Sequence, residues 1–304
     1  MQFVVNEAEN GKTVRDFLKL HGVSAALTAR LKRMDHGILQ NGTRVTVRAV
    51  LQTGDVLSLA IEDEAANEKI LPFATEVEAI LETEELAVFN KPPFMPTHPS
   101  HGHFDDTLAN ALVWRYRDTL PHFRPRFVNR LDRNTSGAVL VAKHAHAAAR
   151  LSRAMAAGEI KKTYFAVLSG IISAETVLKT GIRRREESII FREVCAPHEG
   201  DLAITRLRPL LARNGHTLVE LTPETGRTHQ LRVHMAHLGA PIVGDDLYGT
   251  ACDAISRHAL HAATLTFPAL ESGETVCVSA AVPPDMRALI AMLFGEEGIA
   301  LVEF

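Results

Sequence analysis

Cysteine and aromatic residues are scarce in this chain of 304 residues, which has three cysteines, one tryptophan and three tyrosines. Cys195, Cys252 and Cys277 lie far apart and form no C-x-x-C pair. An odd, unpaired set argues against a disulfide framework and favours reduced thiols in a cytosol. We therefore expect a cytoplasmic protein.

Long apolar runs are also missing. No run approaches the roughly 20 residues that a membrane-spanning helix needs. The first residues, MQFVVNEAEN, lack the basic and then apolar pattern of a signal segment. The hydrophobic fraction of 46% and the charged fraction of 23% are ordinary for a globular protein. The length suggests one large domain and a small one, with no membrane partner.

Positive charge is not in excess, because the formal net charge is −3. The acidity is concentrated in residues 63–85, which hold eight acidic residues and one lysine. Residues 1–62 and 86–304 each carry a net charge of +2. Attraction to phosphate depends on local patches, so the total charge does not exclude a nucleic-acid partner.

The N-terminal residues predict two short helices and a hairpin. Thr13 opens a helical pattern, and Ser24 caps a second helix that Gly37 ends. Asn41-Gly42 is a strong hairpin signal, and Val45 and Val47 alternate on the return strand.

The second predicted helix is basic, with Arg30, Lys32 and Arg33. Charge alone fits a solvated helix face as well as an RNA contact. Residues 10–60 resemble the RNA-binding module of ribosomal protein S-four in this basic helix, the N-G hairpin and the following G-D turn. The resemblance implies a small RNA-binding module over residues 1–62.

Strands and helices alternate along the rest of the chain and predict an α+β domain. Residues 63–85 are assigned to an acidic linker and the first strand of the next domain, and residues 86–304 to a catalytic domain. Asp105 or Asp106 is expected to cap a helix. The segment RTHQLRVHMAHLG is expected to be helical up to Gly239.

The segment NRLDRNTSG, residues 129–137, places one carboxylate, Asp132, between two arginines in a polar turn. Neighbouring cations favour an ionised carboxylate, which acts as a nucleophile or a base. By composition alone, a structural turn is the commoner interpretation. The segment resembles the H-R-L-D-x-x-T-S-G signature of RluA-type pseudouridine synthases, with Asn129 in place of histidine.

Further blocks resemble the same family in the same order. They are F-N-K-P at residues 89–92, K-T-Y-F-A at 162–166, T-G-R-T-H-Q-L-R-V-H at 225–234, and P-I-V-G-D with Y-G at 241–249. Phe94, two residues after the first block, stands at a position that is often glycine in the family. The resemblance implies a pseudouridine synthase fold, with a central mixed, largely antiparallel sheet flanked by helices.

The resemblance also implies roles for individual residues. Asp132 is the catalytic carboxylate, Arg227 pairs with it, and Tyr164 contacts the base. Leu231 packs nearby, and Arg130 occupies the space that a flipped nucleotide leaves. If residues 227–231 are helical, Arg227 and Leu231 share a face. From the residues alone, a half-buried sheet aromatic is the default interpretation of Tyr164, and a solvated surface arginine is the commoner interpretation of Arg227.

Metal binding is not predicted. The spacings of His229, His234 and His237 do not match the helical two-histidine pair, and no acidic ligand lies among them. Hydrogen bonding and packing are the expected roles. Arg183, Arg184 and Arg185 fit phosphate contacts or a solvated loop.

The implied reaction is the isomerisation of uridine to pseudouridine in structured RNA, without a cofactor. The target base has to leave its stack before an enzyme can reach it. Large-subunit ribosomal RNA is the favoured substrate, transfer RNA is an alternative, and a monomer is expected. A non-catalytic RNA-binding or ribosome-assembly factor is another alternative. A hydrolase with paired carboxylates is disfavoured by the single signature carboxylate.

Overall fold

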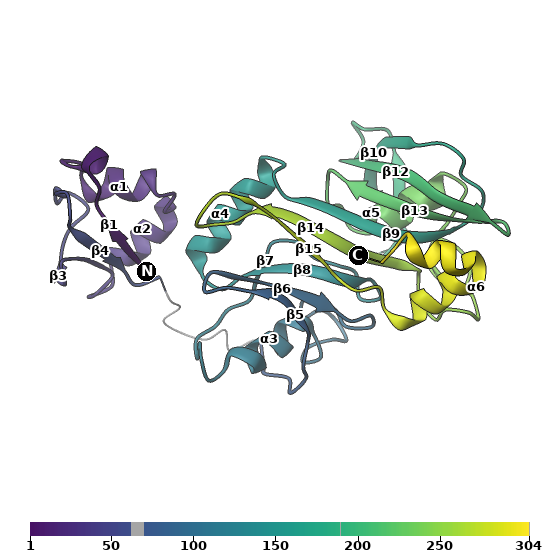
Figure 1. The fold of residues 1–304 in the computed structure, drawn as a ribbon, viewed down its shortest axis with the longest axis horizontal. Coiled ribbons are helices and arrows are strands. Elements are labelled where there is room, and N and C mark those ends of the chain that lie inside the picture. Colours follow the sequence, from purple (N-terminus) through teal and green to yellow (C-terminus); the bar gives the residue numbers. More distant parts are fainter. Residues whose placement is uncertain (62–69, 189, 304) are drawn as a thin grey trace.

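The computed structural model describes residues 1–61, 70–188 and 190–303. The start of the segment predicted as an acidic linker, residues 63–69, therefore lies outside the described residues. Two sheets organise the chain (Figure 1), one of four strands near the N-terminus and one of eleven strands.

The N-terminal sheet has the strand order β1-β4-β2-β3 and packs with two helices on a core of its own. Thr13 and Ser24 cap the two helices as predicted, by accepting the main-chain N–H groups of Asp16 and Leu27. The elements are β1 (Gln2–Val4), the 3-10 turn η1 (Glu7–Glu9), α1 (Val14–Leu20), α2 (Ala25–Leu31), β2 (Ile38–Gln40), β3 (Thr43–Arg44) and β4 (Val56–Leu59).

The predicted N-G hairpin is present between β2 and β3. Asn41 and Gly42 both have positive φ, 52° and 80°, as this tight turn requires. Two details were predicted wrongly. The helix α2 ends at Leu31, before Gly37, and β3 stops at Arg44, before the alternating valines.

The large sheet is mixed and mostly antiparallel, as expected, and β14 and β8 form its parallel pair among the described strands. Its first elements are β5 (Ala79–Glu82), β6 (Leu86–Lys91), α3 (Leu108–Tyr116), β7 (Arg126–Phe127), β8 (Ser136–Ala142), α4 (Ala145–Ala156), β9 (Lys161–Ser169) and β10 (Thr176–Arg184). They are followed by β11 (Arg192–Cys195), β12 (Asp201–Arg213), β13 (His216–Pro223), α5 (Gln230–His237), β14 (Leu260–Pro268), β15 (Thr275–Ser279) and α6 (Pro284–Ala300).

Strand β8 explains how the sheet is covered on both faces. Every residue of β8 is buried, and successive side chains of a strand point to opposite faces. Val139 and Val141 belong to one apolar cluster, whereas Leu140 belongs to another that includes Leu151 of α4. A strand buried on both sides reads as a continuous apolar run, as residues 138–142 of this strand do.

Two helix boundaries differ from the sequence-based expectation. Thr107, not Asp105 or Asp106, caps α3, and Asn110 completes a capping box with it. The helix α5 begins only at Gln230, because His229 has a left-handed backbone conformation, with φ 57° and ψ 18°. Arg227 is therefore not helical, and it does not share a helix face with Leu231.

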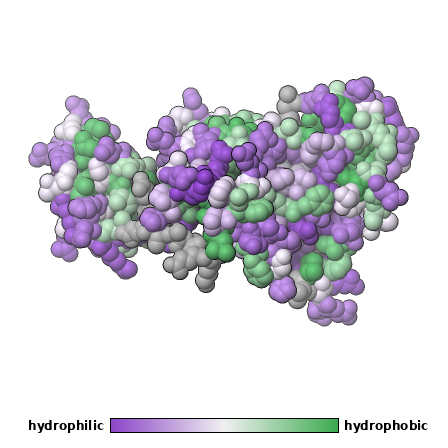
Figure 2. Space-filling model, turned by 90° about the horizontal axis from the view of Figure 1, so that it is seen from below, coloured by the Kyte–Doolittle hydropathy of each residue, from purple (hydrophilic) through white to green (hydrophobic). Residues whose placement is uncertain are grey.

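The N-terminal unit and the large sheet form two lobes (Figure 2), and hydrophilic side chains cover much of the face shown on the small lobe. Arg153 of α4 donates a hydrogen bond to the carbonyl of Gly22, which links the two lobes. Within the described residues, no helix combines the length and the apolar character that a membrane crossing requires.

Candidate active site

A pocket of about 490 Å³ collects the five residues singled out from the sequence. Asp132, Tyr164, Arg227, Arg130 and Leu231 all line it. Its walls come from the segment before β8, from β9, and from the turn and first residues of α5. Segments about 100 residues apart in the chain therefore meet at Asp132.

The segment that carries Asp132 is fixed by the start of β8. Gly137 has φ 116°, and a Cβ atom there would collide with the carbonyl oxygen of Ala262 on β14, so only glycine fits. The hydroxyl of Ser136 lies 2.9 Å from Nδ1 of His261 on β14, and that of Thr135 lies 2.7 Å from Nε2 of His258. The signature residues T-S-G thus hold the Asp132 loop against β14.

Asn129, which replaces the histidine of the family signature, binds main-chain groups of β8 through its side chain. Its amide donates to the carbonyl of Ala138 at 3.1 Å, and its side-chain oxygen accepts the N–H of Leu140 at 2.8 Å. Both partners belong to β8. The residue therefore anchors the loop to the sheet.

Lys91, at the end of β6, lies fully buried behind the loop. Its ammonium donates to the carbonyls of Pro92, Met95 and Arg133 at 2.8, 2.7 and 3.2 Å, which uses all three donors of a protonated lysine. Burial lowers the pKa of Lys91 to about 7, and the negative charge of Asp132 opposes this shift. Lys91 joins the loop after β6 to the residue that follows Asp132.

Arg232, not Arg227, is the arginine beside Asp132. The Nη1 atom of Arg232 lies 3.5 Å from Oδ2 of Asp132. Its Nε and Nη2 atoms bind both oxygens of the fully buried Asp245, at 2.8 and 2.6 Å. Arg227 lines the same pocket, but its Nε donates to the carbonyl of Leu202 at 3.0 Å. The pairing of Arg227 with Asp132 expected from the sequence is therefore wrong.

The geometry of α5 explains this correction. Arg227 lies in the turn before the helix, and Gln230 holds that turn by accepting the N–H of Arg227 at 2.9 Å. Arg232 lies in the first turn of the helix and is almost fully buried. The sequence offers two arginines in one block, and only the path of the chain decides which of them turns inward.

Tyr164 projects from β9 into the pocket and is buried, with 7% of its surface exposed. Burial, and then the negative charge of Asp132, raises the pKa of Tyr164. Its phenol is therefore protonated at neutral pH and is a hydrogen-bond donor. Lys162, two residues earlier on the same face of β9, also lines the pocket, and burial lowers its pKa.

Arg130 and Leu231 frame the pocket in different ways. Arg130 is exposed, and its Nη2 atom donates to the hydroxyl of Thr228 at 3.0 Å, so it connects the Asp132 loop with the turn before α5. Leu231 is buried in the same core cluster as Tyr164 and Leu131, and supplies apolar surface.

Three of the histidines and arginines left open from the sequence, His229, His234 and Arg183, have side-chain partners in the protein. His234 lies 2.9 Å from both the Thr180 and the Thr205 hydroxyls, which fits the expected hydrogen-bonding role. His229 Nδ1 lies 2.8 Å from the hydroxyl of Tyr248. Arg183 forms an ion pair with Glu193 across β10 and β11, at 2.8 Å.

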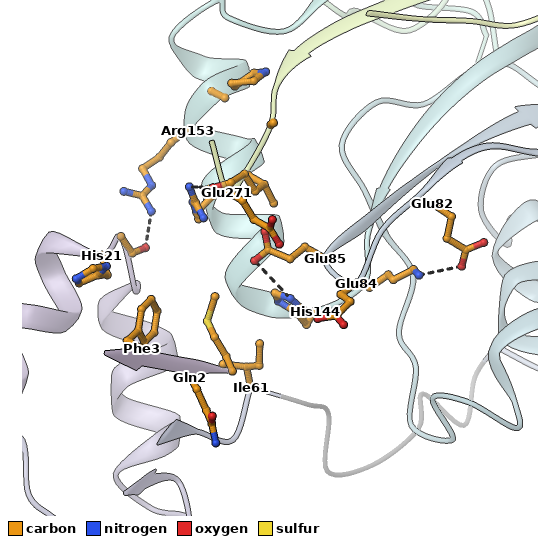
Figure 3. A pocket seen from close by; sticks show the side chains of 18 of the residues that line it. Gln2, Phe3, His21, Ile61, Glu82, Glu84, Glu85, His144, Arg153 and Glu271 are labelled. Carbon is orange, nitrogen blue, oxygen red and sulfur yellow. Dashed lines mark hydrogen bonds and ion pairs between the residues drawn. The ribbon is translucent and has the colours of Figure 1, made fainter. Parts of the chain in front are cut away.

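A larger cleft, of about 1360 Å³, lies between the two lobes (Figure 3), away from Asp132. Gln2, Phe3 and His21 face it from the small lobe. The opposite wall carries four labelled glutamates: Glu82, Glu84, Glu85 and Glu271. We assign the chemistry to the smaller pocket, because Asp132, Tyr164 and Arg232 line it and do not line the larger cleft.

Comparison with known proteins identifies the class. Residues 85–237 match the RNA pseudouridylate synthase family. The chain belongs to this family, and it is an enzyme that isomerises uridine to pseudouridine in RNA. It is 37% identical to the uncharacterized RNA pseudouridine synthase YjbO of Bacillus subtilis, over 91% of this chain and 98% of that protein.

It is also 34% identical to ribosomal large subunit pseudouridine synthase D of Xanthomonas campestris, over 84% of this chain and 77% of that protein. Among solved structures, human RNA pseudouridylate synthase domain containing 1 superposes with a TM-score of 0.56 at 30% identity. That match covers 67% of this chain and 83% of the human one. The family and fold class predicted from the sequence are confirmed.

Proposed function

We propose that this enzyme modifies uridines in large-subunit ribosomal RNA and that Asp132 is its catalytic carboxylate. The observation that carries the assignment is the convergence of Asp132, Tyr164 and Arg232 in one pocket, from three distant segments. Asp132 is the acidic residue of the family signature, and its side chain is 26% exposed, so it is reachable from the pocket.

The isomerisation needs no external atoms. The bond between uracil N1 and ribose C1′ breaks, a bond between C5 and C1′ forms, and the hydrogen on C5 is replaced while N1 gains one. Asp132 reacts with the sugar or base, or takes a proton from the sugar. Tyr164 stacks on the base, Leu231 bounds the site, and Arg130 fills the space of the flipped nucleotide. Arg227, on the pocket wall, contacts the RNA.

The choice of RNA is supported by relatives that are named ribosomal large subunit pseudouridine synthase D in several bacteria. Transfer RNA is the alternative substrate. Mapping pseudouridines in total RNA from a deletion strain distinguishes them, because the missing modifications identify the substrate directly. Loss confined to transfer RNA would contradict the ribosomal assignment.

We further propose that residues 1–62 form an RNA-binding module like that of ribosomal protein S-four, and that the enzyme acts as a cytoplasmic monomer. Support for the module comes from its own sheet and core, and from the basic end of α2. Lys32 and Arg33 are exposed there, whereas Arg30 donates to the carbonyl of Ile61 at 3.0 Å.

The catalytic assignment is tested by Asp132→Asn, which keeps the shape of the side chain and removes its charge. We expect no pseudouridine formation, with unfolding temperature and RNA affinity close to those of the wild type. Measurable turnover by this variant would remove Asp132 from the chemistry. An enzyme that is inactive on every RNA tested, despite an intact Asp132, would favour a non-catalytic RNA-binding factor.

A further inference from the structure

Tyr248 touches both groups that flank Asp132. Its hydroxyl lies 2.8 Å from Nδ1 of His229, and the two rings meet edge to face with centroids 5.6 Å apart. The guanidinium carbon of Arg232 lies 5.2 Å from the centre of the Tyr248 ring. His229 Nε2 and Arg232 Nη1 approach the same atom, Oδ2 of Asp132, at 4.0 and 3.5 Å.

The hydrogen bonds of Tyr248 determine which nitrogen of His229 carries the proton. The Tyr248 oxygen accepts the main-chain N–H of Arg192 at 2.9 Å. Among the described residues, Nδ1 of His229 is then the acceptor within reach of the Tyr248 hydroxyl proton. A neutral imidazole that accepts at Nδ1 carries its proton on Nε2, the atom that faces Asp132.

The backbone of His229 is strained in a way that fits this placement. A non-glycine residue in the left-handed region costs about 1–2 kcal/mol, and such strain tends to persist at functional sites. His229 occupies this region at the residue before α5, between Tyr248 and Asp132. Burial lowers its pKa, and the nearby Asp132 opposes this shift, so the ring is neutral at neutral pH.

We infer that Tyr248 is a positioning residue, which holds His229 as the Nε2–H tautomer and supports Arg232, so that both donate toward Asp132. This inference rests on the proposed role of Asp132. Tyr248 acts through its hydroxyl on His229 and through its ring on Arg232. The tyrosine of the Y-G pair in the 241–249 block thereby orients groups that act on the catalytic carboxylate.

The test is Tyr248→Phe, which removes the hydroxyl and keeps the ring. Loss of one hydrogen bond worth about 1.4 kcal/mol predicts a roughly tenfold lower single-turnover rate at saturating enzyme. RNA affinity should change less than twofold. The matched control is Tyr116→Phe. The Tyr116 hydroxyl donates a hydrogen bond to Glu82 beside the interlobe cleft, away from Asp132. This variant should leave the rate unchanged.

The pH profile gives a readout that a purely structural role would not move. The Tyr248 hydroxyl bonds the neutral form of His229, so its removal should raise the pKa of His229. A protonated His229 would bind the Asp132 carboxylate as a full cation and make it a weaker nucleophile and a weaker base. The acid limb of the rate profile should therefore move to higher pH. The other charged groups that act on His229 are Arg232, Arg192 and Asp245.

A double-mutant cycle shows whether Tyr248 acts through His229. The second variant is His229→Asn, because asparagine tolerates the left-handed backbone better than most residues do. In that background, Tyr248→Phe should change the rate less than twofold. An equal loss in both backgrounds, or no loss and no pH shift in the wild type, would overturn the inference. Turnover by Asp132→Asn would instead overturn the proposed function itself.

Discussion

The substitution Arg232→Lys tests the central correction that the structure makes. It keeps the positive charge and removes the planar fork of the guanidinium. Arg232 binds Asp245 through two parallel hydrogen bonds, and it approaches Asp132 with its remaining nitrogen at 3.5 Å. A lysine ammonium has one nitrogen and cannot reproduce this three-nitrogen arrangement.

The expected magnitude follows from the contacts. A hydrogen bond to a charged group contributes about 1.5–3 kcal/mol, and lysine retains one bond to Asp245 while losing the other. Asp245 also accepts the main-chain N–H groups of Leu247 and Tyr248, both at 3.1 Å, so its carboxylate stays hydrogen-bonded. We therefore expect the free energy of unfolding to fall by about 2 kcal/mol.

The loss in rate depends on the contact with Asp132. If the misplaced cation weakens transition-state stabilisation by about 1.4–4 kcal/mol, the rate falls roughly tenfold to a thousandfold. The assay is a single-turnover measurement at saturating enzyme, with RNA tritiated at C5 of uridine. Tritium is released because C5 becomes bonded to the ribose, so the signal reports chemistry separately from binding.

The matched control is Arg208→Lys. Arg208 of β12 forms the same two-bond pair with Glu220 of β13, at 3.2 and 2.8 Å, but this arginine is half exposed. An exposed pair contributes at most about 1 kcal/mol, so stability and rate should hardly change. A rate for Arg232→Lys within twofold of the wild type, together with a larger loss for Arg227→Lys, would refute the reasoning and restore the pairing of Arg227 with Asp132.

Three further predictions concern other parts of the chain. Replacing Lys32 and Arg33 together by alanine should make the slope of log affinity against log salt shallower by about 1–2, because fewer phosphate contacts form and fewer counterions are released on binding. An unchanged slope would give the module another role. Hydrogen bonds from neighbouring side chains lower the pKa of Glu82 to about 2 despite its partial burial, so Glu82 stabilises the fold above its unfolded pKa of 4.5 and ceases to do so as pH falls toward 2. In denaturant titrations, Glu82→Gln should accordingly be less stable than the wild type at pH 7, and the difference should shrink below pH 4.5. A difference in stability that grows as the pH falls would contradict this prediction. Phe94 has φ 64°, so Phe94→Gly should be more stable than Phe94→Ala by about 1 kcal/mol in the same titrations, whereas equal stabilities would mean that no strain exists there.

Local features of the fold could be predicted from the sequence because neighbouring residues determine them. Thr13 and Ser24 cap helices through main-chain groups three residues away, and Asn41-Gly42 adopts positive φ whatever lies further along the chain. Errors arose where several local signals competed. Asp105, Asp106 and Thr107 can all cap a helix, and only the actual path of the chain selects Thr107.

The family could also be predicted, because its motifs are short and occur in a fixed order. The family motifs pointed to Asp132 and to four of the residues that share its pocket. It could not show which arginine of the 225–234 block reaches Asp132, because Arg232 and Asp132 are 100 residues apart. Their contact depends on where α5 begins, and that start depends on the left-handed backbone of His229.

Tertiary structure alone decided which further groups support Asp132 and its neighbours. No local pattern marks Lys91 as fully buried, because its burial results from the packing of the loop after β6 against the Asp132 segment. Nor does any pattern place the Tyr248 hydroxyl between Arg192 and His229, which approach it from positions 56 and 19 residues away. Hydrogen bonds and charges act over a few ångströms in space, and the sequence records separation along the chain, so these partners become visible only once the sheet has brought the segments together.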